Sequence, residues 1–227
     1  MKLSSIAVPA ILLLGVALFS GCTSPRLERA VRDHPRGEAY APDNIYAEAE
    51  LPAAVRTVAV LPFGTDRLAH PFMPEVETVL INKLRAGGRL NVVLVPASLV
   101  HEVTGSYSVA YNEPLPVELF ERVREAYRAD AILQTEVTAF RPYKPMLLGL
   151  RSRLLERSGK QVLWACDEIF DGGNKAVLTG ARKYAEVHLD QPYPLQSSYS
   201  SLLSPQRFAG YVGETLYATL PGYRQAL

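Results

Sequence analysis

The sequence predicts an α/β fold: a single mixed-sheet α/β sandwich domain with the element order βαβαβββα and a further C-terminal helix. The first observation is period-two alternation within Met146–Leu154 and Val162–Phe170, where apolar residues fill most even positions. Charged residues such as Arg151 and Arg153 fill odd positions, a pattern typical of strands with one buried face. The second observation is a set of helical apolar stripes that follow short valine-rich runs. Together these patterns indicate a sheet covered by helices.

The centre of the predicted sheet is a three-strand meander from Asp130 to Asp171. Ser158-Gly159 supplies the turn between its second and third strands, because glycine tolerates positive φ. The alternation places Trp164 on the apolar face together with Val162 and Cys166. We therefore expect Trp164 to be buried and Cys166 to be a buried, inert thiol.

The remaining elements are predicted from short apolar runs and from helix start and stop signals. VRTVAVLPF and LNVVLVP, at residues 55–63 and 90–96, are valine-rich and end in or near proline, as buried strands do. Four helices and one short helical turn are expected between and after the strands. The helices run from Phe72 to Ala86 before Gly87-Gly88, from Pro116, from Asn174 to about His188, and from Ser204-Pro205, and Ser98 is expected to cap the short turn.

The start of the chain resembles a bacterial lipoprotein signal. Lys2 precedes an apolar run, Ile6–Phe19, that is too short to span a bilayer comfortably. Ser20-Gly21 then precedes Cys22, as in a lipobox. Residues 1–21 are therefore predicted to be removed, and Cys22 to carry palmitate and other acyl chains that hold the protein on a membrane. The alternative is an ordinary cleaved signal, although no A-x-A-like site is evident.

Residues 22–50 are predicted to form a polar tether, and residues 51–227 the α/β domain. The tether contains three prolines and lacks a sustained apolar period. Its Ile45-Tyr46 stretch is the part that could dock on the domain. By resemblance to other lipoproteins, Thr23 in place of Asp favours the outer membrane, with the domain facing the periplasm.

The charge balance excludes nucleic acid as a partner. The chain carries 24 basic and 23 acidic residues, and removal of Lys2 with the signal leaves 23 of each. Nucleic-acid binding needs a basic surface that displaces counterions from phosphates. We therefore expect no nucleic-acid partner.

No sequence motif indicates a metal, a cofactor or a catalytic nucleophile. The four histidines stand far apart and in none of the usual metal-ligand spacings. The densest acidic cluster is Asp167, Glu168 and Asp171, and strand alternation sends Glu168 to the face opposite the other two. The cluster is therefore interpreted as strand-end charges rather than as a catalytic carboxylate pair.

Arg151 and Arg153 are the candidate partner-binding residues. Both lie on the charged face of one strand, where they could form a basic patch for a partner's carboxylates. The alternative is that they are solvated, or that they pair with Asp167 across the hairpin.

Three segments carry a resemblance to a known group of proteins. They are VAVLPF at residues 58–63, ADAILQTEV at residues 129–137 and GKQVLW at residues 159–164. These look like the first strand, a strand entry and a hairpin of the periplasmic lipoprotein superfamily that includes curli-assembly lipoproteins, penicillin-binding-protein activator lipoproteins and the amino-terminal domain of TolB. Arg128 and Thr135 stand where that group often has glycine. The resemblance covers about residues 55 to 190 and implies an assembly or regulatory module, not an enzyme.

Two hypotheses of different classes follow. The first is a lipid-anchored interaction module that recruits or regulates an outer-membrane or peptidoglycan-linked complex through an envelope protein partner. The second is a small periplasmic metal-dependent hydrolase that uses the Asp167/Asp171 region. The sequence favours the first, and it specifies neither the partner nor an oligomeric state.

Overall fold

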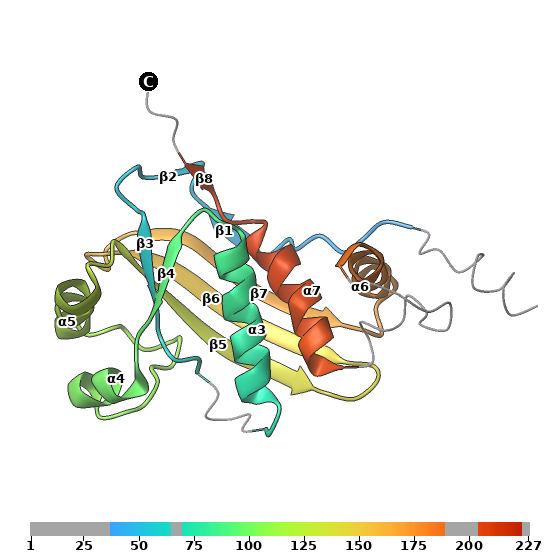
Figure 1. The fold of residues 1–227 in the computed structure, drawn as a ribbon, viewed down its shortest axis with the longest axis horizontal. Coiled ribbons are helices and arrows are strands. Elements are labelled where there is room, and N and C mark those ends of the chain that lie inside the picture. Colours follow the sequence, from blue (N-terminus) through green and yellow to red (C-terminus); the bar gives the residue numbers. More distant parts are fainter. Residues whose placement is uncertain (1–36, 65–69, 189–203, 224–227) are drawn as a thin grey trace, which may run out of the picture.

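In the computed structural model, which describes residues 37–64, 70–188 and 204–223, six strands form one sheet in the order β1-β7-β6-β5-β3-β4 (Figure 1). β3 is parallel to β4 and to β5, whereas β6, β7 and β1 continue the sheet in antiparallel pairings. The predicted mixed sheet and its central meander are therefore confirmed. The strands are β1 (Ile45–Ala47), β3 (Thr57–Val60), β4 (Asn91–Leu94), β5 (Ala131–Arg141), β6 (Leu147–Glu156) and β7 (Val162–Asp171), and a separate parallel pair is formed by β2 (Glu50–Leu51) and β8 (Gly222–Tyr223).

Helices cover the two faces of the sheet unequally. On one face, α3 (Met73–Ala86) and α7 (Pro205–Tyr217) lie side by side, with α6 (Lys175–His188) next to α7 (Figure 1). On the other face, α4 (Ala97–Thr104) and α5 (Val117–Tyr127) pack together at one end of the sheet. The arrangement is the predicted α/β sandwich, with one face only partly covered.

The helices begin and end largely at the predicted signals. α3 ends at Gly87-Gly88, and Gly88 has a φ of +65°. The Ser204 hydroxyl accepts the Arg207 N–H at the start of α7, at 3.3 Å. The Asn174 side-chain oxygen accepts the Ala176 N–H at 2.8 Å, at the start of α6. Each of these contacts satisfies a backbone group that a helix end leaves without a partner.

The prediction that Ser98 caps a short turn is wrong. α4 is eight residues long and starts at Ala97, so Ser98 lies inside its first turn. Pro96 occupies the cap position in an extended conformation and makes no side-chain cap. The reason is that proline fixes its own φ and is tolerated at a helix start, which moves the start ahead of the serine.

Trp164 lies fully buried in the core between the sheet and α3 and α7, as predicted. Its indole Nε1 donates a hydrogen bond to Thr219 Oγ1 at 2.9 Å. Val162, predicted on the same face, packs instead with the α4 and α5 cluster. The register of β6 and β7 shifts beyond Trp164, so that Leu163 is an extra residue and joins Trp164 in the core. Because this bulge adds one residue to β7, Val162 points to the face opposite the one that strict alternation predicts.

The segment from Gly37 to Leu51, here called the strap, runs along the free edge of β7. Its strand β1 pairs with Ala165 and the residues on either side, so the expected docking of Ile45-Tyr46 is confirmed. The contact begins earlier than expected, because Lys183 Nζ on α6 donates to the Gly37 carbonyl at 3.0 Å. Residues 37–50 were predicted as tether and lie against the domain. Cys22 and the signal segment lie outside the described residues.

Candidate functional site

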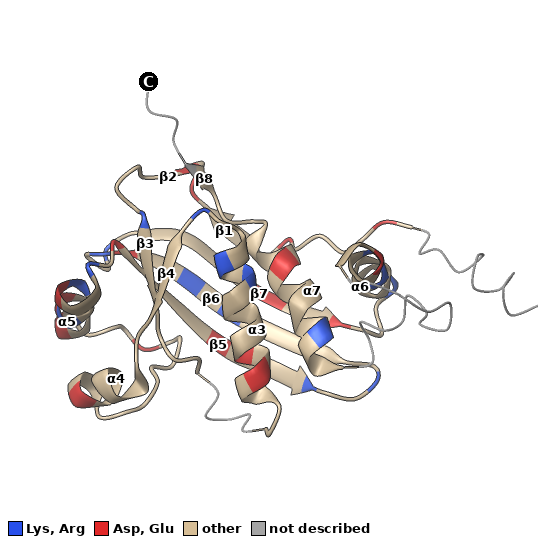
Figure 2. Ribbon diagram, viewed as in Figure 1, with Lys and Arg blue, Asp and Glu red and all other residues tan. Residues whose placement is uncertain are grey.

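The partly covered face of the sheet leaves a polar surface exposed over β6, β7 and β1. α4 and α5 pack on Ala59, Ile132 and Leu155, which lie toward one end of the strands. Beyond these three residues the same face of the sheet is polar, and we call this part of the surface the open face. The open face comprises Tyr46 on β1, Gln134 and Glu136 on β5, Arg151 and Arg153 on β6, and Asp167 and Ile169 on β7. Figure 2 shows basic positions on β6 between acidic positions on β5 and β7.

A loop is fastened over part of the open face by side chains of β5. Gln134, which is 1% exposed, donates from Nε2 to the carbonyls of Val109 and Ala110 at 2.9 and 3.0 Å. Glu136 Oε2 accepts the backbone N–H of Tyr111 at 3.2 Å. These contacts hold Tyr111 against the sheet. The polar row of β5 therefore positions an aromatic ring, and this use of the row could not be deduced from strand alternation.

Both arginines of the candidate patch lie beside the Tyr111 ring. The Arg153 guanidinium carbon is 4.7 Å from the ring centre, and that of Arg151 is 5.5 Å from it. Arg153 also donates to Gln134 Oε1 at 2.7 Å and to the Glu113 carbonyl at 3.0 Å. Burial lowers the pKa of Arg153, and burial raises the pKa of Tyr111. Arg153 therefore holds the loop in place, and Arg151 is the arginine nearer the free surface.

Arg151 forms an ion pair with Asp167 on the neighbouring strand. Its Nε and Nη2 both lie 2.7 Å from Asp167 Oδ2, and the hydrogen bond that Arg151 donates to Asp167 raises the pKa of Arg151. The pairing across the hairpin that was left open as an alternative is thus the one observed. With both side chains more than a third exposed, the pair contributes little to stability. It does fix the orientation of both groups.

A hollow of about 170 Å³ lies over β1, β6 and β7 on this face. Two tyrosines and three polar side chains line it, and they come from the strap, the fastened loop, β6 and β7. Its lining consists of Asn44, Tyr46, Tyr111, Arg151, Ala165, Cys166 and Asp167. The hollow is therefore the place on the open face where aromatic and polar groups converge.

The three carboxylates of the acidic cluster have different partners. Asp167 faces Arg151, and Asp171 contacts Arg141 at 3.3 Å. Glu168 lies on the opposite face, as predicted, and is 2% exposed. Within the described part of the chain, no group of three or more His, Cys, Asp or Glu side chains is placed to hold a metal ion.

Glu168 holds the strap against β7, a role that the sequence analysis did not predict. Its Oε1 accepts the backbone N–H groups of Asp43 and Asn44 at 2.8 and 2.7 Å, and its Oε2 accepts the Tyr40 hydroxyl. Tyr40 also packs edge-on against Phe170, with ring centres 5.2 Å apart. A single buried carboxylate thus fastens the strap to β7. The only sequence signal was a charged residue at an apolar position of the alternation.

Cys166 is buried at 3% exposure, and burial raises the pKa of its thiol to about 12. A thiol with so high a pKa remains protonated near neutral pH and is a poor nucleophile. The expectation of a buried thiol is confirmed.

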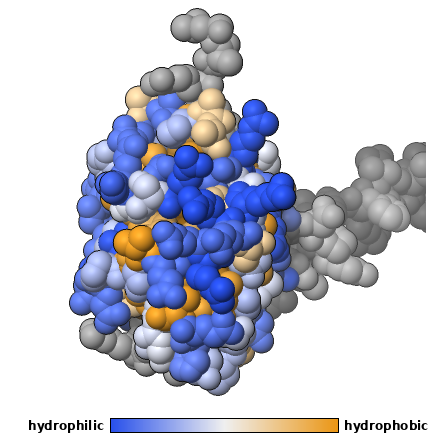
Figure 3. Space-filling view, turned by 90° about the vertical axis from the view of Figure 1, so that its left-hand side faces the viewer, coloured by the Kyte–Doolittle hydropathy of each residue, from blue (hydrophilic) through white to orange (hydrophobic). Residues whose placement is uncertain are grey.

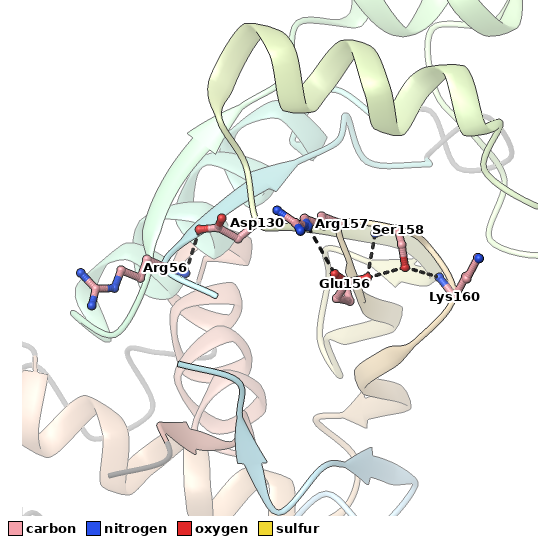
Figure 4. A network of polar contacts seen from close by, with 6 residues as sticks. All are labelled: Arg56, Asp130, Glu156, Arg157, Ser158 and Lys160. Carbon is pink, nitrogen blue, oxygen red and sulfur yellow. Dashed lines mark hydrogen bonds and ion pairs between the residues drawn. The ribbon is translucent and has the colours of Figure 1, made fainter. Parts of the chain in front are cut away.

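Two of the three segments that carried the resemblance contain residues with structural roles. Asp130 Oδ2 accepts the backbone N–H groups of Arg56 and Thr57 at 3.0 and 2.9 Å, which joins the starts of β3 and β5. Its carbonyl accepts the Arg157 N–H at 2.9 Å, and Figure 4 shows this connection to the β6–β7 turn. Gly159 in that turn has a φ of +72°, and a side chain there would meet the Phe120 ring.

The end of the molecule formed by α4 and α5 offers no comparable site. Figure 3 shows this end as mostly hydrophilic, with apolar side chains in separate patches. Tyr107 and Val117, at 66% and 73%, are the most exposed large apolar side chains of this region. In the described ranges, no helix has the length and apolar character needed to cross a membrane.

No protein-family model and no curated protein matches the sequence. Solved structures of similar fold include the PelC dodecamer from Paraburkholderia phytofirmans, with 17% identity and a TM-score of 0.43 over 80% of this chain and 96% of that chain. Lipoprotein GNA1162 from Neisseria meningitidis has 14% identity and a TM-score of 0.34, over 59% and 99%. TolB from Acinetobacter baumannii has 12% identity and a TM-score of 0.27, over 70% and 32%.

TolB and a bacterial lipoprotein are among the solved structures that the chain matches, at TM-scores below 0.5. The links to curli-assembly and penicillin-binding-protein activator lipoproteins are not shown by these comparisons. At such identities the likeness concerns the fold alone.

Proposed function

We propose that this protein is a lipid-anchored periplasmic interaction module, which recruits or regulates an outer-membrane or peptidoglycan-linked complex by binding an envelope protein on its open face. The observation that carries the proposal is the half-covered sheet. Strands β6 and β7 present the fixed side chains of Arg151 and Asp167 to solvent, beside Tyr111 of the fastened loop and on the same face as the exposed Ile169. Groups fixed in this way lose little entropy when a partner binds.

Binding explains the fixed groups better than turnover does. Asp167 and Asp171 each face an arginine, which holds their charge in ion pairs. The Cys166 thiol is buried, and the motif residues Asp130 and Gly159 stabilise turns and strand starts. The residues that stand out in the sequence therefore have structural roles.

The anchor is Cys22, and the strap limits how far the domain stands from it. Residues 23–36 separate Cys22 from the first described residue of the strap, Gly37. Even a fully extended chain of this length spans at most about 50 Å. A partner at the same membrane would therefore meet the open face at a raised effective concentration, so that weak intrinsic affinity suffices.

The anchor is tested by labelling with palmitate. We expect Cys22→Ala to abolish incorporation and to leave either precursor or unanchored protein. Undiminished labelling of the variant would overturn the lipoprotein assignment.

The partner surface is tested by affinity purification from cross-linked envelopes. Ile169→Glu places a charge on the open face at a residue that is 53% exposed, so the fold should tolerate it. We expect this variant to lose the cross-linked partner. The matched control is Val187→Glu on α6, which is 77% exposed and distant in the fold. Equal recovery with both variants would place the partner elsewhere.

A further inference from the structure

We propose that the hollow over β1, β6 and β7 binds one pyranose ring of a neutral, β-linked glycan. The inference goes beyond the proposed function, because it assigns a glycan ligand to one hollow of the open face. It names the chemistry by which the protein would recognise a glycan strand of the envelope. The evidence is the kind of side chain that lines the hollow, the state of its charges and its size.

Two tyrosines provide the apolar walls. Tyr46 projects from β1 on the face shared with Ala165 and is 52% exposed. Tyr111 is held by the fastened loop, with its ring beside the guanidinium groups of Arg151 and Arg153. A pyranose with equatorial substituents presents C–H groups on both faces, and such a surface packs well on an aromatic ring that also carries a polar hydroxyl.

The polar groups of the hollow are a donor beside an acceptor. Arg151 contacts only one oxygen of Asp167, Oδ2, and no described residue donates to Asp167 Oδ1. Asn44 is fixed nearby by its hydrogen bond to the Asp167 carbonyl at 2.9 Å. A carboxylate oxygen that accepts, next to guanidinium N–H groups that donate, is complementary to a pair of neighbouring sugar hydroxyls.

The charge of the hollow selects against anionic ligands. The two charged groups that line the hollow, Arg151 and Asp167, form an ion pair. The next cation, Arg153, is not part of the lining and donates to Gln134 Oε1 and the backbone carbonyl of Glu113. A phosphate or carboxylate would have to displace Asp167 from its arginine and approach it closely. A neutral ligand rich in hydroxyl groups meets no such cost.

The size and rigidity of the hollow suit a single ring. A volume of about 170 Å³ holds one sugar unit and not a drug-sized ligand. Strand residues of β6 and β7 form part of its wall, and the loop that supplies Tyr111 is fastened by Gln134 and Glu136. The strap that supplies Asn44 and Tyr46 is fastened by Glu168. The site is therefore formed before the ligand arrives.

The test is saturation-transfer NMR with the full chain in detergent and millimolar cellotetraose or chitotetraose as the probe. We expect transfer to ring C–H protons of at least one of the two. Tyr46→Ala should weaken the binding about three- to tenfold, the value of one aromatic contact. Asp167→Asn should weaken it as well, because the amide nitrogen cannot accept. The matched control, Tyr143→Ala, removes a tyrosine that is 69% exposed and outside the hollow, and it should bind like wild type.

Absence of transfer from both oligosaccharides would overturn the proposal, as would unchanged binding in Tyr46→Ala and Asp167→Asn. A protein that cross-links to residue 46 equally well with and without excess cellotetraose would also overturn it, and would assign the hollow to a protein segment. Because the NMR test uses purified protein, its failure leaves the proposed docking of an envelope protein standing.

Discussion

Glu168 on β7 accepts the backbone N–H of Asn44 at 2.7 Å, and through this contact the sheet holds the strap. The same carboxylate accepts the N–H of Asp43 and the hydroxyl of Tyr40. A buried acceptor with three donors is costly to weaken, because the donors would remain in a poorly hydrated place. The strap is thus part of the folded domain.

We expect Glu168→Gln to lower the free energy of unfolding by about 2–3 kcal/mol, since the neutral amide loses charge-assisted hydrogen bonds and introduces its own donors. Urea unfolding gives the magnitude, and faster amide exchange at Asn44 would locate the effect in the strap. Glu102→Gln, which alters only an exposed pair with Arg122, is the control and should stay within about 0.5 kcal/mol of wild type. Equal stability of the two variants would show that the carboxylate is dispensable.

Arg128 ends α5 in the left-handed conformation, with a φ of 52°. This is the position at which the lipoproteins of the sequence resemblance often have glycine, and its side chain is exposed. Arg128→Gly should raise the free energy of unfolding by about 1 kcal/mol, because glycine adopts this conformation without steric cost. Arg124→Gly, inside the same helix, should lower it by about 1 kcal/mol. A loss of stability in Arg128→Gly would mean that the Arg128 side chain stabilises the fold.

Trp164 is the only tryptophan and is fully buried. Its emission should be blue-shifted and poorly quenched by iodide. Trp164→Ala should cost about 3–5 kcal/mol through lost burial and the cavity that remains. Trp164→Phe should cost less, since it keeps most of the ring contacts and loses the bond to Thr219. Red-shifted, fully quenchable emission from the folded protein would contradict this core.

Glu214 on α7 connects three helices. Its Oε2 lies 2.8 Å from Lys83 Nζ on α3, and its Oε1 lies 2.8 Å from His188 Nε2 on α6. Burial opposes ionisation, but the hydrogen bonds from Lys83 and His188 outweigh it and lower the pKa of Glu214 from its usual value.

A carboxyl whose pKa is lower in the folded state stabilises the fold fully above its unfolded pKa. That stability is lost as the pH falls through the lowered folded value. We therefore expect the Tm to fall more steeply in wild type than in Glu214→Gln between about pH 5 and about pH 3. Calorimetric scans across this range provide the measurement, and parallel curves would show that Glu214 is uncoupled from folding.

Much of the fold is predictable because local patterns and tertiary contacts agree. The alternation in β6 and β7 follows from burial on one face, and the apolar stripes of α3 and α7 meet that face. Val162 is the exception, because a bulge at Leu163 depends on how two strands pair and leaves no local signature. β2 and β8 are too short to produce a periodic signal, and each is ordered by a segment far away in the sequence.

The site is predictable only in part. Alternation places Arg151 and Arg153 together on one face, and the structure confirms this placement. Tyr111 could not be found from the sequence, since it sits in a polar loop and reaches the arginines only after Gln134 and Glu136 fasten the loop to β5. The sequence did show charged and amide side chains alternating on two neighbouring strands, and such a polar row indicates that another segment could pack on it.

The claim that a partner binds the open face is tested most directly by photo-cross-linking in intact cells. A cross-linking amino acid in place of Ile169 on the open face, and in place of Val187 on α6 as the control, compares two exposed apolar positions of one chain. The account predicts a discrete adduct at residue 169 that Arg151→Glu abolishes, and none at residue 187. No adduct at residue 169, or the same adducts at both positions, would contradict it.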